Sequence, residues 1–151
     1  HARALLTSTP EGATDYIDAD LRDPGAILEA AAKTLDFGKP IALILSGILG
    51  HIDYDDACRI VRRLMDPLPS GSYLSLNDGI ETEAFAEAMR LWNETVSVPY
   101  YPRTPEQIAR FFDGLELVDP GLVSVPLWRP EPSPFGPAGE SVAFGGVGRK
   151  P

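Results

Sequence analysis

Residues 39–52, Lys-Pro-Ile-Ala-Leu-Ile-Leu-Ser-Gly-Ile-Leu-Gly-His-Ile, contain the longest nearly apolar stretch of the chain. Within them, Ile41 to Leu49 form a continuous apolar run, which is typical of a central parallel strand with both faces covered. We therefore expect this strand in the middle of a sheet. The stretch has about half of the ~20 residues that cross a bilayer, so it predicts no membrane span and no membrane partner.

Helical and extended patterns alternate on both sides of this stretch, which is typical of α/β architecture. Upstream, Thr14 to Asp18 are predicted as a short strand, and Asp23-Pro24 opens a helix that ends near Leu35. Downstream, Asp53 to Met65 carry the apolar stripe of an amphipathic helix. Further strands are predicted at 72–77, 115–118, 123–127 and 141–148, and further helices at 81–96, at 104–113 and, as a helix tail, at 1–6. The pattern predicts a doubly wound α/β domain with a mostly parallel sheet.

Charge and cysteine content narrow the classes of partner and compartment. The chain has 22 acidic and 13 basic residues and a net charge of -9. Nucleic acid is therefore not expected as a partner, because phosphate binding needs a concentrated positive face. Cys58 is the single cysteine, so no internal disulfide can form, and residues 1–12 lack the order of a signal peptide. Both observations favour the cytoplasm.

Three polar or glycine-containing segments follow predicted strands, at residues 18–23, 46–51 and 77–79. Ligands of open α/β sheets bind in the crevice at the carboxyl ends of the strands. These segments are therefore the candidate site.

Asp20 and Leu21 follow the first predicted strand. A carboxylate there can accept a hydrogen bond from an exocyclic amine while the next backbone N–H meets a ring nitrogen, a pairing that suits adenine. The alternative is that Asp18, Asp20 and Asp23 only cap the following helix. Composition leaves these two interpretations about equal.

Ser46, Gly47 and His51 follow the central strand, and Asp78 follows the next one. Gly47 lets a backbone approach a ligand closely, and Ser46 offers a hydroxyl. His51 is a candidate general base, although a lone histidine is more often structural. Asp78 is a candidate for the substrate pocket, although it is also an ordinary turn former. No metal is expected, because the chain lacks metal-ligand spacing.

The order of these segments resembles the bacterial S-adenosyl methyltransferase family that was first described as a domain of unknown function. The resemblance covers nearly the whole chain. Its carriers are His-Ala-Arg-Ala-Leu-Leu at 1–6, Tyr-Ile-Asp-Ala-Asp-Leu-Arg-Asp-Pro at 16–24, residues 39–52, Pro-Ser-Gly-Ser-Tyr-Leu at 69–74 and Gly-Gly-Val-Gly-Arg-Lys-Pro at 145–151.

The resemblance implies a class I methyltransferase fold with strand order 3-2-1-4-5-7-6 and S-adenosylmethionine as methyl donor. Residues 14–18 would be its third strand and 41–49 its fourth. Asp20 would meet the adenine amine and Leu21 the adenine ring, while Ser46 and Gly47 would lie beside the methionine part. The acceptor would face His51, Asp78 and residues 100–103.

One departure from the family pattern affects the expected organisation. The glycine-rich loop of the first strand and the acidic residue of the second would both precede His1, and neither is present. We therefore expect residues 1–151 to be the C-terminal two thirds of a single domain, inactive alone. The missing N-terminal segment would come from the same or another chain.

The expected function is S-adenosylmethionine-dependent methyl transfer to a small-molecule acceptor. Two alternatives stay open: a non-catalytic protein of this fold that binds the donor or acts as a scaffold, and a protein that binds a nicotinamide dinucleotide in the same crevice.

Overall fold

The computed structural model describes residues 8–134, 136 and 138–151, so the helix predicted at 1–6 lies outside the described residues. The described part is an α/β structure, as predicted. Its helices are α2 (Pro24–Ala31), α3 (Tyr54–Met65), α4 (Glu83–Asn93) and α5 (Pro105–Ala109). Its strands are β1 (Ala42–Ser46), β2 (Tyr73–Gly79), β3 (Glu116–Leu117), β4 (Val123–Ser124) and β5 (Ala143–Arg149). Short 3-10 helices occupy Leu49–His51, Arg110–Phe112 and Val125–Leu127.

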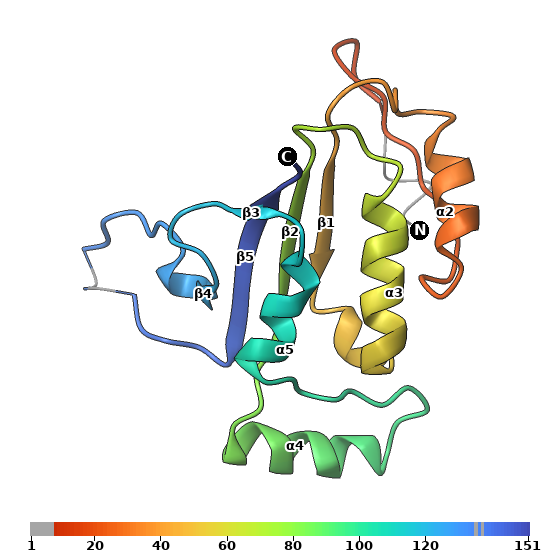
Figure 1. Ribbon diagram of the computed structural model, residues 1–151. Coiled ribbons are helices and arrows are strands. Elements are labelled where there is room, and N and C mark those ends of the chain that lie inside the picture. The colour runs from red at the N-terminus through yellow and green to blue at the C-terminus, as the bar shows by residue number, and fades with distance from the viewer. Residues whose placement is uncertain (1–7, 135, 137) are drawn as a thin grey trace.

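The strands form one sheet in the order β1-β2-β5-β3, with β4 also paired to β5. β1 and β2 are parallel, whereas β5 runs antiparallel to β2, β3 and β4. The sheet, predicted to be mostly parallel, is therefore mixed. Ser46 pairs with Asn77, so the carboxyl ends of β1 and β2 meet at one edge, beyond which α4 lies (Figure 1).

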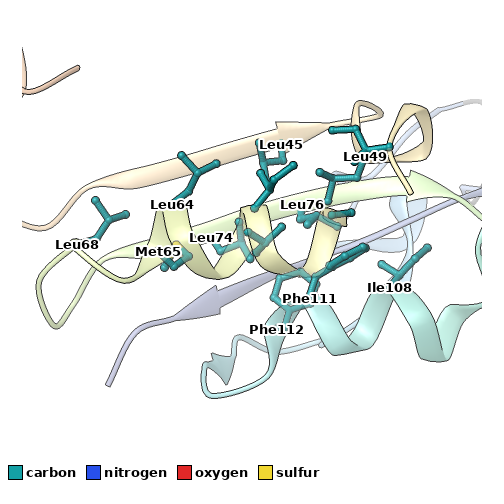
Figure 2. Close-up of a cluster of buried hydrophobic side chains, with 14 residues drawn as sticks. Leu45, Leu49, Leu64, Met65, Leu68, Leu74, Leu76, Ile108, Phe111 and Phe112 are labelled. Atoms are coloured by element: carbon teal, nitrogen blue, oxygen red, sulfur yellow. The ribbon is translucent and has the colours of Figure 1, made fainter. Parts of the chain in front are cut away.

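Helix α3 confirms the amphipathic prediction almost to the residue. Asp53 precedes it and accepts a hydrogen bond from the backbone N–H of Asp55, which satisfies one of the free donors at the helix start. Its apolar stripe is buried against the sheet. Figure 2 shows this stripe facing β1, β2 and the segment around Phe111. Helix α2 packs against α3 (Figure 1).

The core lies between this helical layer and one face of the sheet. It comprises Leu45, Leu49, Ile52, Ala57, Ile60, Val61, Leu64, Met65, Leu68, Leu74, Leu76, Ile108, Phe111 and Phe112.

The central position predicted for residues 41–49 is wrong for the described sheet, because β1 lies at its edge. Leu45 points into the core and is 6% exposed, but Ile44 on the opposite face is 69% exposed. Neighbouring residues of a strand face opposite sides of the sheet. The described residues thus cover one face of β1 only.

The strand predicted at 14–18 is also wrong, since residues 13–20 form neither helix nor strand. A strand exists only as part of a ladder, and no described strand lies beside this segment. The strand predicted at 123–127 stops at Ser124, where a 3-10 turn containing Pro126 replaces it. Among the described helices, none is long and apolar enough to cross a membrane.

Candidate functional site

The carboxyl ends of β1 and β2 lie side by side. Ser46 and Asp78 lie within the last residues of these strands, since β2 continues to Gly79 and does not end at residue 77 as predicted. The backbone N–H of Gly47 donates to the Asn77 carbonyl at 2.9 Å, and Asn77 Nδ2 donates to Ser46 Oγ at 3.1 Å. Gly47 has φ of 61°, a left-handed conformation that favours glycine. No atom lies within 4 Å of the position that a Cβ at residue 47 would take. The turn after β1 is therefore open.

Arg22 connects the segment that contains Asp20 and Leu21 to the turn after β1. The sequence analysis did not identify Arg22 as a site residue. Asp20 Oδ1 accepts from the Arg22 N–H at 2.9 Å, and Arg22 Nη2 donates to the His51 carbonyl at 3.0 Å. Leu21 packs against the edge of the core. All three predicted segments therefore meet at the carboxyl ends of β1 and β2.

Asp78, Tyr100 and Arg103 form a buried polar cluster behind this edge. Asp78 is 1% exposed and Arg103 3%. The Tyr100 hydroxyl donates a short hydrogen bond to Asp78 Oδ1 and accepts one from the Gly79 N–H at 2.8 Å. Arg103 Nη2 donates to the carbonyls of Leu49 and Ile52 at 2.6 and 2.7 Å. The cluster joins the end of β2 to the turn after β1.

Burial changes the pKa values of two groups in the cluster. It raises the pKa of the Asp78 carboxyl, although hydrogen bonds from Tyr100 and Gly79 and the charge of Arg103 oppose the rise. It also raises the pKa of Tyr100, with the hydrogen bond to Asp78 as the next cause. Asp78 Oδ2 and Arg103 Nε lie 3.8 Å apart, and neither atom has a hydrogen-bond partner among the residues that the structure describes. The pair is thus an ion pair without a direct hydrogen bond.

Glycines make room for the Tyr100 ring. A Cβ at Gly50 would collide with that ring, and a Cβ at Gly79 would lie 2.9 Å from the Tyr100 hydroxyl. The ring meets His51 edge-on, with centroids 5.0 Å apart and an interplanar angle of 79°.

His51 is partly buried, and its Nδ1 lies 2.9 Å from the Pro99 carbonyl. Of the two candidate catalytic residues, only His51 retains exposed surface, because Asp78 is buried in the cluster. The segment 100–103, expected to face the acceptor, is divided: Tyr100 and Arg103 turn inward, while Tyr101 is 54% exposed.

Two recesses flank α3. One, of about 510 Å³, lies between α2 and α3, and the other, of about 530 Å³, lies between α3 and the segment around Phe111. Neither is lined by the residues that follow β1 and β2. Among the described residues, no group of three histidine, cysteine or acidic side chains could hold a metal ion.

Comparison with protein families gives one match over residues 1–151, to the S-adenosyl methyltransferase family. The chain belongs to this family. Its fold matches that of a DUF574 family protein from Streptomyces avermitilis, with 40% identity and a TM-score of 0.86 over 99% of this chain. It also matches a Thermobifida fusca protein with 38% identity and a TM-score of 0.84 over 99% of this chain.

The chain spans 60% and 58% of the lengths of these two proteins. A more distant structure, a SAM-dependent methyltransferase from Anabaena variabilis, shares the fold at 14% identity with a TM-score of 0.56, covering 88% of this chain and 57% of that one. The curated proteins contain no match.

The family implies S-adenosylmethionine, and the described residues fit such a donor. The open turn at Gly47 leaves space beside the end of β1. The Asp20 side chain is 61% exposed, and its Oδ2 accepts no hydrogen bond from the described residues. An acceptor for an exocyclic amine and room for a close backbone approach are thus present at one edge.

Proposed function

We propose that this chain forms part of an S-adenosylmethionine-dependent methyltransferase that acts on a small-molecule acceptor. The observation that carries the proposal is the meeting of three segments at the carboxyl ends of β1 and β2, where Arg22 joins residues 20–22 to the turn after β1. This is the edge at which open α/β sheets bind their ligands.

The donor-binding residues of the proposal are Asp20, Leu21, Ser46 and Gly47. Asp20 Oδ2 would accept from the adenine amine, and Leu21 would contact the adenine ring. Ser46 and Gly47 would lie beside the methionine part, where the left-handed turn allows backbone contact.

The donor, when bound, supplies an activated methyl group on a sulfonium centre. The chain's own contribution is to hold the acceptor in line with that methyl, which removes much of the entropic barrier. The buried cluster behind β2 supports this role because it fixes the two turns that border the site.

We also propose that further residues, from the same or another chain, cover the free edge and open face of β1. The 69% exposure of Ile44 supports this, because isoleucine is among the residue types most often fully buried. The relatives' greater length supports it as well. We expect that the donor binds only when these further residues are present.

Donor binding tests the proposed function. Calorimetry of the protein with its covering residues should detect S-adenosylhomocysteine, and Asp20→Ala should weaken that binding about 10-fold or more through loss of a charge-assisted hydrogen bond. Asp36→Ala, an exposed aspartate outside these three segments, is the control and should leave the affinity unchanged. Binding of a nicotinamide dinucleotide without S-adenosylhomocysteine would overturn the proposal. Labelled donor with a small-molecule library separates transfer from binding alone.

A further inference from the structure

We infer that His51 is the proton acceptor of the methyl transfer, through Nε2, and that the acceptor is a phenolic hydroxyl. This inference rests on the proposed function and names its substrate class. It comes from the way the structure fixes the imidazole ring and the backbone around it.

The hydrogen bond to Pro99 determines the tautomer of His51. A carbonyl oxygen can only accept, so at 2.9 Å from the Pro99 oxygen Nδ1 must carry the proton. In the neutral ring the lone pair is then on Nε2. Nε2 has no hydrogen-bond partner in the described part of the chain, and it is therefore free to take a proton from a ligand.

The Pro99–Tyr100 peptide group is itself held in place from α4. Asn93 Oδ1 accepts from the Tyr100 N–H at 2.8 Å, and Asn93 Nδ2 donates to the Tyr100 carbonyl at 2.8 Å. One peptide group thus accepts from His51 on one side and donates to Asn93 on the other. Hydrogen bonds aligned in this way strengthen one another.

Two arginines fix the backbone of the His51 turn. Arg103 binds the carbonyls of Leu49 and Ile52, and Arg22 binds the carbonyl of His51 itself. The side chain of Arg103 is buried and that of Arg22 is 57% exposed, and together they hold three carbonyls of the short turn that carries the imidazole. Arg103, Arg22 and Asn93 are therefore positioning residues in this inference.

The surroundings of His51 indicate the acceptor. Ile48, in the same turn, is 41% exposed, and Tyr101, whose N–H bonds the Gly50 carbonyl at 2.9 Å, is 54% exposed. Exposed apolar and aromatic groups in the turn that carries the base, and in the segment bonded to that turn, suit a hydroxyl carried on an aromatic molecule. A phenol, with a pKa of about 10, gives up its proton to an imidazole far more readily than an aliphatic alcohol does.

The proposed step balances in charge and atoms. The phenolic oxygen attacks the sulfonium methyl carbon, and an O–CH3 bond forms as the S–CH3 bond breaks with its electron pair on sulfur. The phenolic proton passes to His51 Nε2. The positive charge of the sulfonium is thereby exchanged for that of the imidazolium.

Nitrogen NMR tests the tautomer without any donor. The chain has only two histidines, so labelling histidine with 15N gives two rings, and His51→Gln assigns the signals. We expect protonated Nδ1 and unprotonated Nε2 in the neutral His51 ring. A proton on Nε2 instead would overturn the inference, whatever the protein binds.

Transfer assays on the protein with its covering residues test the chemistry. His51→Gln should bind S-adenosylhomocysteine with unchanged affinity but methylate phenols about 100-fold more slowly. Added imidazole should partly restore transfer by His51→Ala. Asn93→Asp, which keeps the acceptor for the Tyr100 N–H, should retain more transfer than Asn93→Ala.

The outcomes separate the two proposals. If the unsubstituted protein binds no donor, the proposed function fails and this inference fails with it. If the protein binds donor but His51→Gln methylates phenols at the original rate, only the inference fails. A preference for carboxylates, which need no base, would overturn it as well.

Discussion

Arg103 shows which groups can surround a buried positive charge. Its guanidinium lies 5.2 Å from the centroid of the Tyr54 ring and 5.4 Å from that of Phe111, while Nη2 binds two carbonyls. Aromatic faces and carbonyl oxygens replace much of the lost hydration. The nearby Asp78 supplies opposite charge at 3.8 Å. Removing one member of such a pair leaves the other uncompensated.

The Tyr100 hydroxyl should contribute measurably to stability. Tyr100→Phe removes the donor to Asp78 and the acceptor of the Gly79 N–H, both in a buried place. We expect a loss of about 1–3 kcal/mol in the free energy of unfolding, measured by urea denaturation. Tyr101→Phe is the matched control, since that side chain is 54% exposed and should change stability by less than about 0.5 kcal/mol. Equal losses in both variants would contradict the role of the buried hydroxyl.

Asp78 should make stability depend on pH in the acid range. Burial raises its pKa in the folded state, so folding binds a proton between the ordinary carboxyl value and the raised one. The contribution of Asp78 is therefore fully present below the unfolded pKa of about 3.9 and is lost as pH rises through the folded pKa.

Urea titrations of the unsubstituted protein and Asp78→Asn across this range measure that contribution. The asparagine does not titrate, so the difference in unfolding free energy between the two proteins should move in favour of Asp78→Asn as pH rises. A difference independent of pH would show that the Asp78 pKa is not raised by folding.

Site residues could be predicted from sequence where polar residues or glycines come directly after an apolar run. They could not be predicted where their role depends on contact with a residue far away in the sequence. Ser46, Gly47 and Asp78 were found because glycine and polar residues directly followed apolar runs. The pairing of Asp78 with Arg103 spans 25 positions of sequence, and an arginine in a loop is ordinarily solvated. Arg22 was missed for the same reason, since nothing local links it to the His51 carbonyl.

The close packing of strand β5 against β2 depends on a glycine in β5. A Cβ at Gly145 would lie 2.7 Å from Asn77 Cβ and 2.8 Å from the Leu76 carbonyl oxygen on the neighbouring strand. Backbone cannot move aside as a flexible side chain can. β2 and β5 therefore approach as closely as they do because residue 145 has no side chain.

Gly145→Ala should destabilise the protein by about 1–3 kcal/mol, the usual cost of forcing an extra methyl group into a packed place. Gly139→Ala is the control, because no atom lies within 4 Å of its Cβ position. Thermal melts of both variants give the comparison. A lowering of the melting temperature as large in Gly139→Ala as in Gly145→Ala would contradict the packing argument.

Elements with their own local signals were predicted well. Helix α3 has an N-cap, an apolar stripe and a length that favours it, and each is visible in sequence. A strand has no such independence, because its hydrogen bonds go to other segments. Residues 14–18 illustrate this: their sequence favours a strand, but they belong to none of the strands of the described sheet.

For the whole molecule, the sheet has a packed face and an open one. Helices α3 and α5 cover the face that carries Leu45, Leu74 and Leu76. On the other face Ile44 is 69% and Tyr73 39% exposed. The apolar run at 41–49 was expected to be buried on both faces. Its composition fits such burial, but the described residues cover only one face.

Substitutions on the two faces of β1 should therefore have different effects on stability in the 151-residue chain and in a protein whose further residues cover β1. In the 151-residue chain, Ile44→Ser should change the free energy of unfolding by less than about 0.5 kcal/mol, whereas Leu45→Ala should cost about 2–5 kcal/mol because Leu45 is in the core. Once further residues cover β1, Ile44→Ser should cost about 1.5–3 kcal/mol, the value of burying such a side chain. Urea denaturation of the variants in both forms measures the change. An Ile44→Ser effect that stays small when the covering residues are present would show that they do not pack on this face.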